Sequence, residues 1–405
     1  MHVIFIAPGY PDEMPFFVRG LAMHGASVYG VSDVPRAQLP EMAKQHLSGY
    51  VQVTNLNDEM AVVGAVTKAM RGKHVERVIC QWEPGVVLAA RMREALGVPG
   101  MEIEQATRFR DKDVMKQVIH AAGIRAARHG RAASMKEVRE VCERVGFPAI
   151  VKPIAGAGSM DTFKVDDARE LEAAFSKLRH VPEVNVEEFI KGEEHTYDTI
   201  CVNGVMKYRN IGYYRPNPLI ARSHEWISPQ TLCLRHSEDA YFAPAHTLGQ
   251  AVIDALGFQT GFTHMEWFRT ADGEAVFSEI AARPAGARTV DLMNYVSDTD
   301  LFVGCAEAEV KGTFSQPTER KYTAVNIFKR AHGHGQIRRV EGLAGLMQRY
   351  GEHVVGIDLL PVGAQRRDWI QTLVSDGYVT IRHPEYPMAC EIADAFGNDL
   401  RLYAS

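Results

Sequence analysis

The most constraining stretch of this sequence is THMEWFRTADGEAVFSEIAARPAG, which contains His264 and ends at Gly286. Alternating apolar residues predict two short strands, at about 263–269 and 275–282. The turn between them holds Asp272-Gly273, a strong hairpin signal. A chain with this stretch therefore contains an antiparallel hairpin that carries acidic side chains among apolar ones.

Two glutamates lie on this hairpin. Glu266 shares its strand face with His264 and Phe268, and Glu279 shares a face of the partner strand with Phe277. In this register we expect the two glutamates to lie diagonally across from each other, about 7–8 Å apart. Two carboxylates this close either repel each other or hold a positive charge. The alternative is a solvated hairpin face with two unrelated acids.

The composition is that of a soluble globular protein, with 46% hydrophobic and 23% charged residues. The 405 residues are enough for two to four domains. A formal net charge of −5 gives no electrostatic reason to expect nucleic acid or an anionic membrane as partner. The six cysteines are scattered without a CxxC pair, and the apolar runs are too short for a signal peptide or a membrane span. We expect a cytoplasmic protein with reduced thiols.

The first hundred residues alternate strands with helices. Strands are expected at 2–7, in SVYGVSD and at 75–82, and helices end near His24, near residue 71 and at Leu96. This alternation predicts a small parallel α/β sheet. The first turn lacks GxGxxG, so a nicotinamide cofactor is not indicated. Glu83 follows a strand end, where open α/β sheets bind ligands, with a structural role as the alternative.

Two lysines stand at positions that suit an anion. Lys112 opens a helix that Gly123 ends, where a positive charge opposes the helix dipole unless an anion is near; a solvated lysine is the alternative. Lys152 interrupts an apolar strand, and because burying an unpaired ammonium group is costly, we expect an anionic partner for it. The Gly-rich turn Ala155 to Ser159 follows. Its backbone N–H groups suit phosphate, although the P-loop pattern GxxxxGK[ST] is absent.

The block VEEFIKGEEHTYD precedes a hairpin turn at Asn203-Gly204. Within it, Glu187 and Glu188 come before the apolar pair Phe189-Ile190, and Glu193-Glu194 follow. Glutamates at a strand exit commonly only face solvent. The alternative is that this ordered set reads the edge of an adenine and a ribose.

Residues 209–236 are rich in Pro and Arg and too irregular for a regular element, and long loops in compact domains are often functional. Four side chains of this stretch are candidates to close over a substrate, with ordinary surface placement as the alternative: Arg215, Arg222, His224 and Trp226. Arg288 follows the hairpin, and its guanidinium group suits a substrate carboxylate.

The remaining sequence predicts further helices and strands. Helices are expected at 241–257, at 289–310 and near Met388–Phe396. Strands are expected in YTAVNIFKR, VVGIDLLPV and GYVTIRHP. We expect the final segment to form a small C-terminal subdomain.

Four motifs, in this order and spacing, resemble the ATP-grasp superfamily, and within it the carboxylate–amine (or carboxylate–thiol) ligases. They are DKDVMKQVIHAAGI at 111–124, FPAIVKPIAGAGS at 147–159, VEEFIKGEEHTYD at 186–198, and HMEWF with SEIAARPAG at 264–286. The resemblance covers most of the chain, to at least Gly286. It implies an α/β protein, α+β in parts, with ATP held between two antiparallel sheets. The implied parts are a Rossmann-like parallel N-terminal domain (1–108), a small grasp subdomain (109–192), a larger antiparallel-sheet subdomain with the metal site (193–315) and a C-terminal extension (316–405).

The resemblance also implies roles for residues at the motif positions. The implied phosphate contacts are Lys112, Lys152 and a loop with Gly156, Gly158 and Ser159. Glu187 and the backbone of Glu188 and Ile190 would meet adenine, and Glu194 would bind the ribose hydroxyls. Phe189 is a further ATP-binding candidate. Glu266 and Glu279 would ligate Mg²⁺, with Mn²⁺ as an alternative. The catalytic residues would be Arg283, beside the transferred phosphate, and Lys152. The substrate-binding candidates are Arg288, Arg215, His264 and Trp226.

The implied activity is ATP-dependent ligation of a carboxylate to an amine. The product is an amide or peptide, formed through an acyl phosphate with release of ADP and phosphate, on amino-acid-like substrates. The alternatives are formyl or carboxyl transfer to a small metabolite, and a non-catalytic ATP-binding regulatory protein. Ala281 favours the last, because many family members have an Asn there that assists a metal, whereas the presence of both glutamates argues against it. The expected partners are small-molecule carboxylates and amines, without nucleic acid or membrane, and a homodimer is left open.

Overall fold

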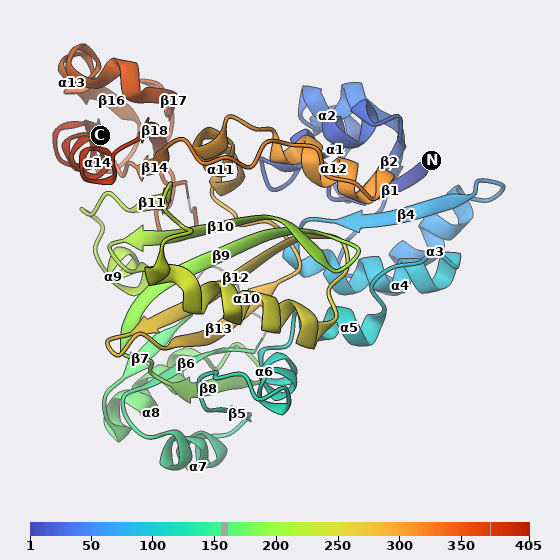
Figure 1. Cartoon of the computed structure of the whole chain (residues 1–405), viewed down its shortest axis with the longest axis horizontal. Coiled ribbons are helices and arrows are strands. Elements are labelled where there is room, and N and C mark those ends of the chain that lie inside the picture. The colour runs from blue at the N-terminus through green and yellow to red at the C-terminus, as the bar shows by residue number, and fades with distance from the viewer. Residues whose placement is uncertain (155–160, 373) are drawn as a thin grey trace.

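The computed structural model describes residues 1–154, 161–372 and 374–405 (Figure 1). In this part of the chain the strands form four sheets, and in Figure 1 the colour runs from blue in the N-terminal sheet to red at the C-terminal strands. No described helix is long and apolar enough to cross a membrane.

The N-terminal part is the expected parallel sheet with helices against it. Its strands lie in the order β3-β2-β1-β4, with β1 at His2–Ile6, β2 at Ser27–Ser32, β3 at Leu47–Gln52 and β4 at Val75–Cys80. Its helices are α1 Met14–Met23, α2 Glu41–His46, α3 Glu59–Ala69, α4 Val86–Leu96 and α5 Ile103–Arg108. The strand order reverses between β1 and β4, which is where open α/β sheets place ligands. Glu83 comes three residues after the last residue of β4, in the short 3₁₀ turn η2 (Glu83–Gly85), and so lies at this end of the sheet.

The small subdomain is a four-stranded antiparallel sheet in the order β5-β8-β6-β7. Its strands are β5 His129–Ala132, β6 Ala149–Pro153, β7 Phe163–Val165 and β8 Val184–Glu188, and its helices are α6 Lys112–Ala121, α7 Met135–Val145 and α8 Ala168–Lys177. Ser134 and Glu137 form a capping box that starts α7. Residues of α7 and α8, including Val138, Val141 and Leu171, form a core with the sheet.

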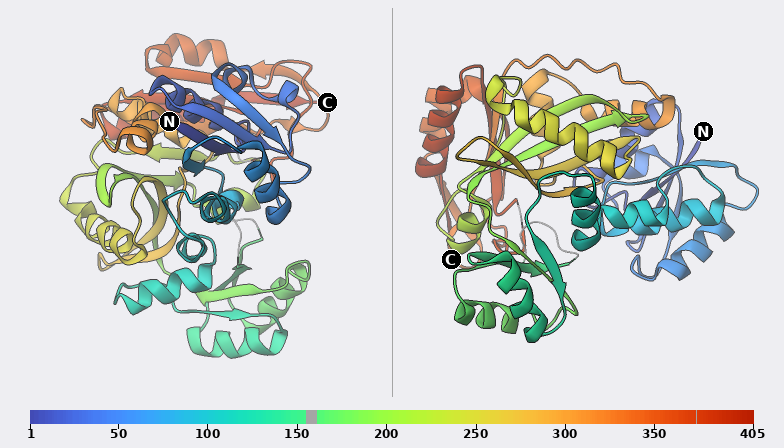
Figure 2. Two further views of the ribbon diagram at one scale, coloured as in Figure 1. Left: turned by 90° about the vertical axis from the view of Figure 1, so that its right-hand side faces the viewer. Right: turned by 60° about the horizontal axis from the view of Figure 1, so that its bottom comes forward.

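An eight-stranded antiparallel sheet makes up the centre of the molecule, in the order β13-β12-β9-β10-β11-β14-β18-β17. Its strands are β9 Gly192–Val202, β10 Val205–Arg215, β11 Gln230–Cys233, β12 Gly261–Thr270, β13 Ala275–Ala281, β14 Thr323–Phe328, β17 Val354–Leu359 and β18 Gly377–His383. The Asn203-Gly204 turn joins β9 to β10, as predicted. The small subdomain lies below β12 and β13 in Figure 1, and Figure 2 shows the same arrangement from two other sides.

The helices around the large sheet include α9 Pro218–Ser223, α10 Ala243–Leu256, α11 Thr289–Ser297 and α12 Leu301–Lys311. The prediction of one helix over 289–310 was wrong. The chain breaks the helix at Asp298, whose φ of 48° is left-handed, and Asp300 then caps α12 by accepting a hydrogen bond from the Val303 backbone N–H. The prediction that residues 209–236 hold no regular element was also wrong, because β10, α9 and β11 lie there.

The C-terminal segment extends the large sheet and adds a small one. Strands β14, β18 and β17 continue the eight-stranded sheet. The small sheet has the order β15-β19-β16, with β15 at His332–Gly333, β16 at Ile337–Glu341 and β19 at Arg401–Ala404. Helices α13 Leu343–Tyr350 and α14 Tyr386–Asp399 complete this segment.

Helix α1 of the N-terminal domain packs directly on α12 of the large subdomain. The ring of Phe17 meets that of Phe302 edge-on, with 4.9 Å between centroids. Gly20 allows the close approach, because a Cβ there would lie 2.7 Å from the Phe302 carbonyl oxygen. This contact sets the position of the N-terminal domain, and therefore of Glu83, relative to the hairpin.

Candidate active site

A cleft of about 340 Å³ lies between the small subdomain and the hairpin strands β12 and β13. This volume is in the range of small-molecule sites. The residues proposed from sequence that line it are Lys112, Lys152, Glu187, Glu188, Phe189, Ile190, Glu194, Glu266 and Glu279. The structure thus gathers, around one cleft, residues that are separated by up to 167 positions. Gly156, Gly158 and Ser159 lie outside the described residues.

Glu266 and Glu279 are direct partners across the β12–β13 ladder. The predicted diagonal placement was wrong because β13 has a bulge: Trp267 pairs with Phe277, and Ser278 is the extra residue. For the same reason Phe277 does not share a face with Glu279. Trp267 and Phe277 are fully buried in the core on the far side of the hairpin, while both glutamates reach the cleft.

The two carboxylates differ in charge. Burial and the neighbouring Glu279 raise the pKa of Glu266 to about 8. Burial alone would also raise the pKa of Glu279, but the ammonium groups of Lys112 and Lys152 hold that pKa well below its usual range.

Among the described residues, no group of three or more His, Cys, Asp or Glu side chains gathers as a metal site. Two opposed carboxylates nevertheless fit Mg²⁺, which takes few protein ligands and completes its octahedron with phosphate oxygens and water.

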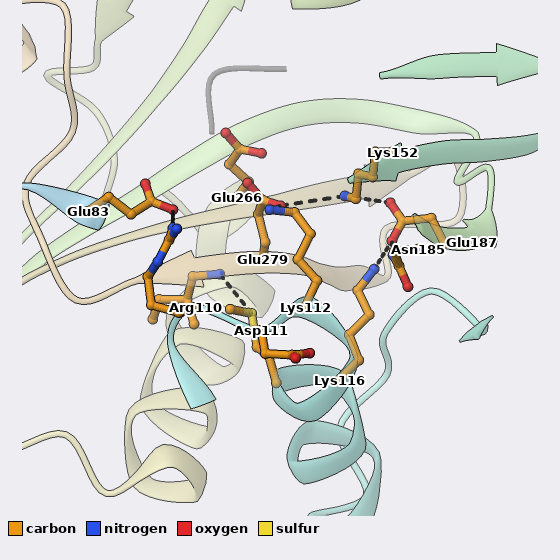
Figure 3. Close-up of polar contacts among 12 residues, drawn as sticks. Glu83, Arg110, Asp111, Lys112, Lys116, Lys152, Asn185, Glu187, Glu266 and Glu279 are labelled. Atoms are coloured by element: carbon orange, nitrogen blue, oxygen red, sulfur yellow. Dashed lines mark hydrogen bonds and ion pairs between the residues drawn. The ribbon is translucent and has the colours of Figure 1, made fainter. Parts of the chain in front are cut away.

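Lysines and glutamates alternate along the cleft floor (Figure 3). Lys112 Nζ lies 3.1 Å from Glu279 Oε2, and Lys152 Nζ lies 3.5 Å from the same oxygen and 2.7 Å from Glu187 Oε1. The other oxygen of Glu187 pairs with Lys116 Nζ. Lys112, at the start of a helix, and Lys152, in an apolar strand, therefore both have anionic partners.

Both carboxylate oxygens of Glu187 are contacted by other side chains of the protein. Besides the two lysines, the amide of Asn185 donates a hydrogen bond to Glu187 Oε2 at 2.8 Å. Burial would raise the pKa of Glu187, but Lys116 and Lys152 lower it to about 2. The carboxylate is thus ionised and oriented by Lys116 and Lys152. An adenine contact through Glu187 remains a prediction.

Two further glutamates flank the cleft. The carboxylate of Glu188 pairs with Arg125 and Arg128, each at 3.1 Å, and its backbone N–H donates to the Arg128 carbonyl. Glu194 accepts a 2.5 Å hydrogen bond from the amide of Asn217, just before α9. Burial raises the pKa of Glu194 to about 7, although Asn217 acts in the opposite direction. Glu194 therefore faces the cleft as an acid that titrates near neutral pH.

Arg283 reaches towards the N-terminal domain. Its Nε and Nη2 donate to Glu83 Oε2 at 2.8 and 2.5 Å, and Arg110 Nη1 donates to Glu83 Oε1 at 2.5 Å. Burial would raise the pKa of Glu83, but the two guanidinium groups bring it below its usual value. Glu83 is therefore a carboxylate shared by two arginines, a contact that the sequence did not indicate.

The substrate-side candidates are dispersed. Arg215 pairs with Asp394 of α14 at 2.9 Å, and Trp226 is 72% exposed beside the ring of His224. Arg288 pairs with Asp291 at 2.8 Å. None of Arg215, Trp226 and Arg288 is among the described residues that line the cleft.

His264 sits next to the metal candidates. Its Nδ1 lies 2.6 Å from Asp198 Oδ1, and its Nε2 lies 3.8 Å from Glu266 Oε1. Asp198 is fully buried and also accepts hydrogen bonds from Thr196 and Asn210. The imidazole ring of His264 therefore lies between the carboxylates of Asp198 and Glu266. A direct substrate contact by His264 remains a prediction.

Sequence reasoning missed Lys116. It follows Lys112 by four residues, so both lie on one helix face, and this spacing could have revealed it. Asn217 gave no comparable local signal, because its partner Glu194 lies 23 residues away. Glu83 was noted for its place after a strand, but its contact with Arg283 could not be foreseen because 200 residues separate the two.

The replacement Lys116→Met is expected to lower the free energy of unfolding by about 3 kcal/mol, the lower end for breaking a buried ion pair, since Glu187 keeps Lys152 and Asn185. Urea unfolding followed by circular dichroism measures it. Lys136→Met, at an exposed position on α7, is the matched control and should change stability by less than about 0.5 kcal/mol. Equal stability of the two variants would show that Lys116 is not held as the structure has it.

Comparison with known proteins agrees with this architecture. Residues 117–289 match the family model described as D-ala D-ala ligase C-terminus. The chain is 22% identical over 293 residues to the L-arginine-specific L-amino acid ligase of Bacillus subtilis, covering 71% of this chain and 70% of that protein. It is 25% identical over 269 residues to the alanine–anticapsin ligase of Bacillus subtilis, covering 60% of this chain and only 56% of that relative.

The crystal structure of an L-amino acid ligase from Bacillus licheniformis superposes with a TM-score of 0.81 at 19% identity, covering 100% of this chain and 98% of that one. The matched family model spans three of the four motifs, and the superposition shows that this chain has the fold of that ligase, in agreement with the resemblance of the motifs to the ATP-grasp carboxylate–amine ligases.

Proposed function

We propose that this chain is an ATP-dependent carboxylate–amine ligase that acts on amino-acid-like substrates. The observation that carries the proposal is the opposed pair Glu266 and Glu279 facing Lys112 and Lys152 across one cleft. The relatives named above are amino-acid ligases, which supports the substrate class. The cleft volume and its apolar wall, which includes Phe189, Ile190 and Leu219, suit an adenine ring beside the charged floor.

The reaction has two steps. A carboxylate oxygen of the first substrate attacks the γ-phosphorus of ATP, and ADP leaves, giving an acyl phosphate. The nitrogen of the amine substrate then attacks the acyl carbon, phosphate leaves, and the nitrogen loses a proton to form the amide. Both steps need mainly positioning and neutralisation of negative charge, which explains why no nucleophile is required of the protein.

The residues of the cleft have separate tasks in this scheme. Glu266 and Glu279 would hold Mg²⁺, which supplies charge neutralisation on the phosphate oxygens when it is bound. Lys112 and Lys152 are held by Glu279 in the structure and would exchange this partner for phosphate oxygens. Glu187 would keep Lys152 in place during the exchange, because their 2.7 Å contact does not involve Glu279.

A second candidate is an ATP-binding protein without turnover, which Ala281 favours. Ala281 pairs with His264 on β12, next to the metal candidates, and offers no ligand where many ATP-grasp enzymes have Asn. Formyl or carboxyl transfer is a related catalytic alternative.

The test is phosphate release from MgATP with pooled carboxylic acids crossed with pooled amines, amino acids included in both. The proposal predicts release that requires one acid and one amine together. Release with formate or bicarbonate would favour the transfer reaction. ATP binding with no release in any combination would favour the binding protein.

Binding of the nucleoside is expected to strengthen with pH. Ribose hydroxyls donate to an ionised Glu194, and with a pKa of about 7 this group is mostly protonated below neutrality, so binding releases a proton. Adenosine affinity should therefore rise about tenfold between about pH 6 and pH 8. Calorimetry with adenosine measures it, because adenosine has no phosphate that titrates there.

The variant Glu194→Gln should bind adenosine with a nearly flat pH profile. The matched control is Glu193→Gln at the adjacent position, where the carboxylate is 70% exposed. A Glu194→Gln profile as steep as that of the unchanged protein would remove Glu194 from the ribose site.

A further inference from the structure

One carboxylate of the N-terminal domain holds the arginine that follows the metal hairpin. Glu83 Oε2 accepts hydrogen bonds from both Nε and Nη2 of Arg283, and Glu83 Oε1 accepts one from Arg110. The side chains are 11% exposed for Glu83 and 17% for each arginine. The turn η2, the segment before α6 and the segment after β13 therefore meet at the largely buried carboxylate of Glu83 (Figure 3 shows its contact with Arg110).

The contacts orient the guanidinium group and still leave part of it available. Arginine has five N–H donors. Two of those on Arg283 go to Glu83, and one on Nη1 goes to the Pro284 carbonyl at 2.7 Å. Within the described residues, one N–H on each Nη nitrogen is thus left for a ligand. The plane of the group is set before any ligand arrives, which lowers the cost of binding an anion.

Glu83 is itself well fixed. It starts the tight turn η2, where Gly85 packs so closely that a Cβ would lie 2.8 Å from Cys80 Sγ. The Arg283 and Arg110 contacts hold its carboxylate in the ionised form. Arg110 lies two residues before Lys112, the first residue of α6. The carboxylate of Glu83 therefore orders both Arg283 and the chain just before Lys112, which is one of the lysines proposed to bind phosphate.

We propose that Glu83 is a positioning residue for the ligation reaction, which acts through Arg283 by holding its guanidinium group toward the reacting acyl phosphate. The inference rests on the proposed function. It assigns to the N-terminal domain a part in the chemistry, although neither Glu83 nor Arg283 is among the described residues that line the nucleotide cleft.

A double-mutant cycle tests the inference with four proteins: the unchanged chain, Glu83→Gln, Arg283→Ala and the double variant. Glu83→Gln is expected to lower kcat by about tenfold to a hundredfold, as for a misplaced catalytic group, with KM for MgATP changed by less than about twofold. The double variant should be no slower than Arg283→Ala, because Glu83 then has nothing left to position. Losses that multiply would overturn the inference, since Glu83 would act independently of Arg283.

Two variants separate positioning from a general loss of structure. Glu83→Asp keeps the charge and should recover part of kcat, while Glu59→Gln breaks the Glu59–Arg91 pair elsewhere in the N-terminal domain and should leave kcat unchanged. Glu59→Gln as slow as Glu83→Gln would show that any loosening of that domain slows the reaction, and would overturn the assignment.

A second readout does not need turnover. Glu83→Gln should raise the rate at which phenylglyoxal labels Arg283, measured by peptide mass spectrometry, and leave the labelling of Arg288 unchanged. Unchanged labelling of Arg283 would overturn the inference. If the unchanged protein shows no release that depends on acid and amine, the proposed function fails, and the labelling still decides whether Glu83 orders Arg283.

Discussion

The variant Glu279→Ala is expected to lose phosphate release by about a thousandfold or more. Glu279 pairs with Glu266 across the hairpin and contacts Lys112 and Lys152, so its removal would take away half of the proposed metal site. A bound metal supplies several kcal/mol of charge stabilisation, and about 4 kcal/mol corresponds to a thousandfold in rate. Steady-state assays at saturating MgATP and substrates measure the loss.

The same variant should bind ATP without metal at least as tightly as the unchanged protein, because two lysines lose a competing carboxylate. Glu279→Gln keeps the side-chain volume and should lose turnover to a similar extent. Glu274→Ala, at an exposed position just before the same strand, is the matched control and should keep full activity. Normal phosphate release by Glu279→Ala would refute the metal assignment.

The variant Lys152→Met is expected to weaken ATP binding by about tenfold to a hundredfold. Lys152 is buried, and its ammonium group is kept charged because Glu187 and Glu279 outweigh the effect of burial on its pKa. A hydrogen bond from a charged group to a phosphate is worth about 1.5–3 kcal/mol, which gives the expected loss. Isothermal calorimetry with ATP measures it.

Two comparisons make this result specific. Adenosine affinity should change much less than ATP affinity, because the lysine lies on the phosphate side of the cleft in this account. Lys136→Met, on the outer helix α7, should bind ATP normally. An unaltered ATP affinity in Lys152→Met would show that this lysine does not reach the phosphates.

The sequence predicted best those features whose cause is local. Asp272-Gly273 and Asn203-Gly204 mark hairpin turns by their own backbone preferences, and both hairpins form. An anionic partner was expected for Lys152 in its apolar strand and was one of two possibilities for Lys112 at its helix start, and both lysines have anionic partners. The order of motifs along the chain was enough to indicate the fold.

Features that depend on distant contacts could not be predicted. The bulge at Ser278 shifts the pairing of β13 by one residue and has no sequence signal of its own. The partners of Glu83 and Arg215 depend on how distant parts of the chain pack, since 200 residues separate Glu83 from Arg283 and 179 separate Arg215 from Asp394. For this reason the residues that gather around the cleft were anticipated more fully than the positions of the substrate-side candidates.

The most direct test of the account follows the oxygen atoms of the carboxylate substrate. With the acid labelled by ¹⁸O in its carboxylate, formation of an acyl phosphate transfers one of these oxygens to the phosphate that the amine later displaces. Each released phosphate is expected to carry one ¹⁸O, with ADP as the other product, measured by mass spectrometry. Unlabelled phosphate, or release of AMP and pyrophosphate, would contradict activation of the carboxylate by phosphoryl transfer.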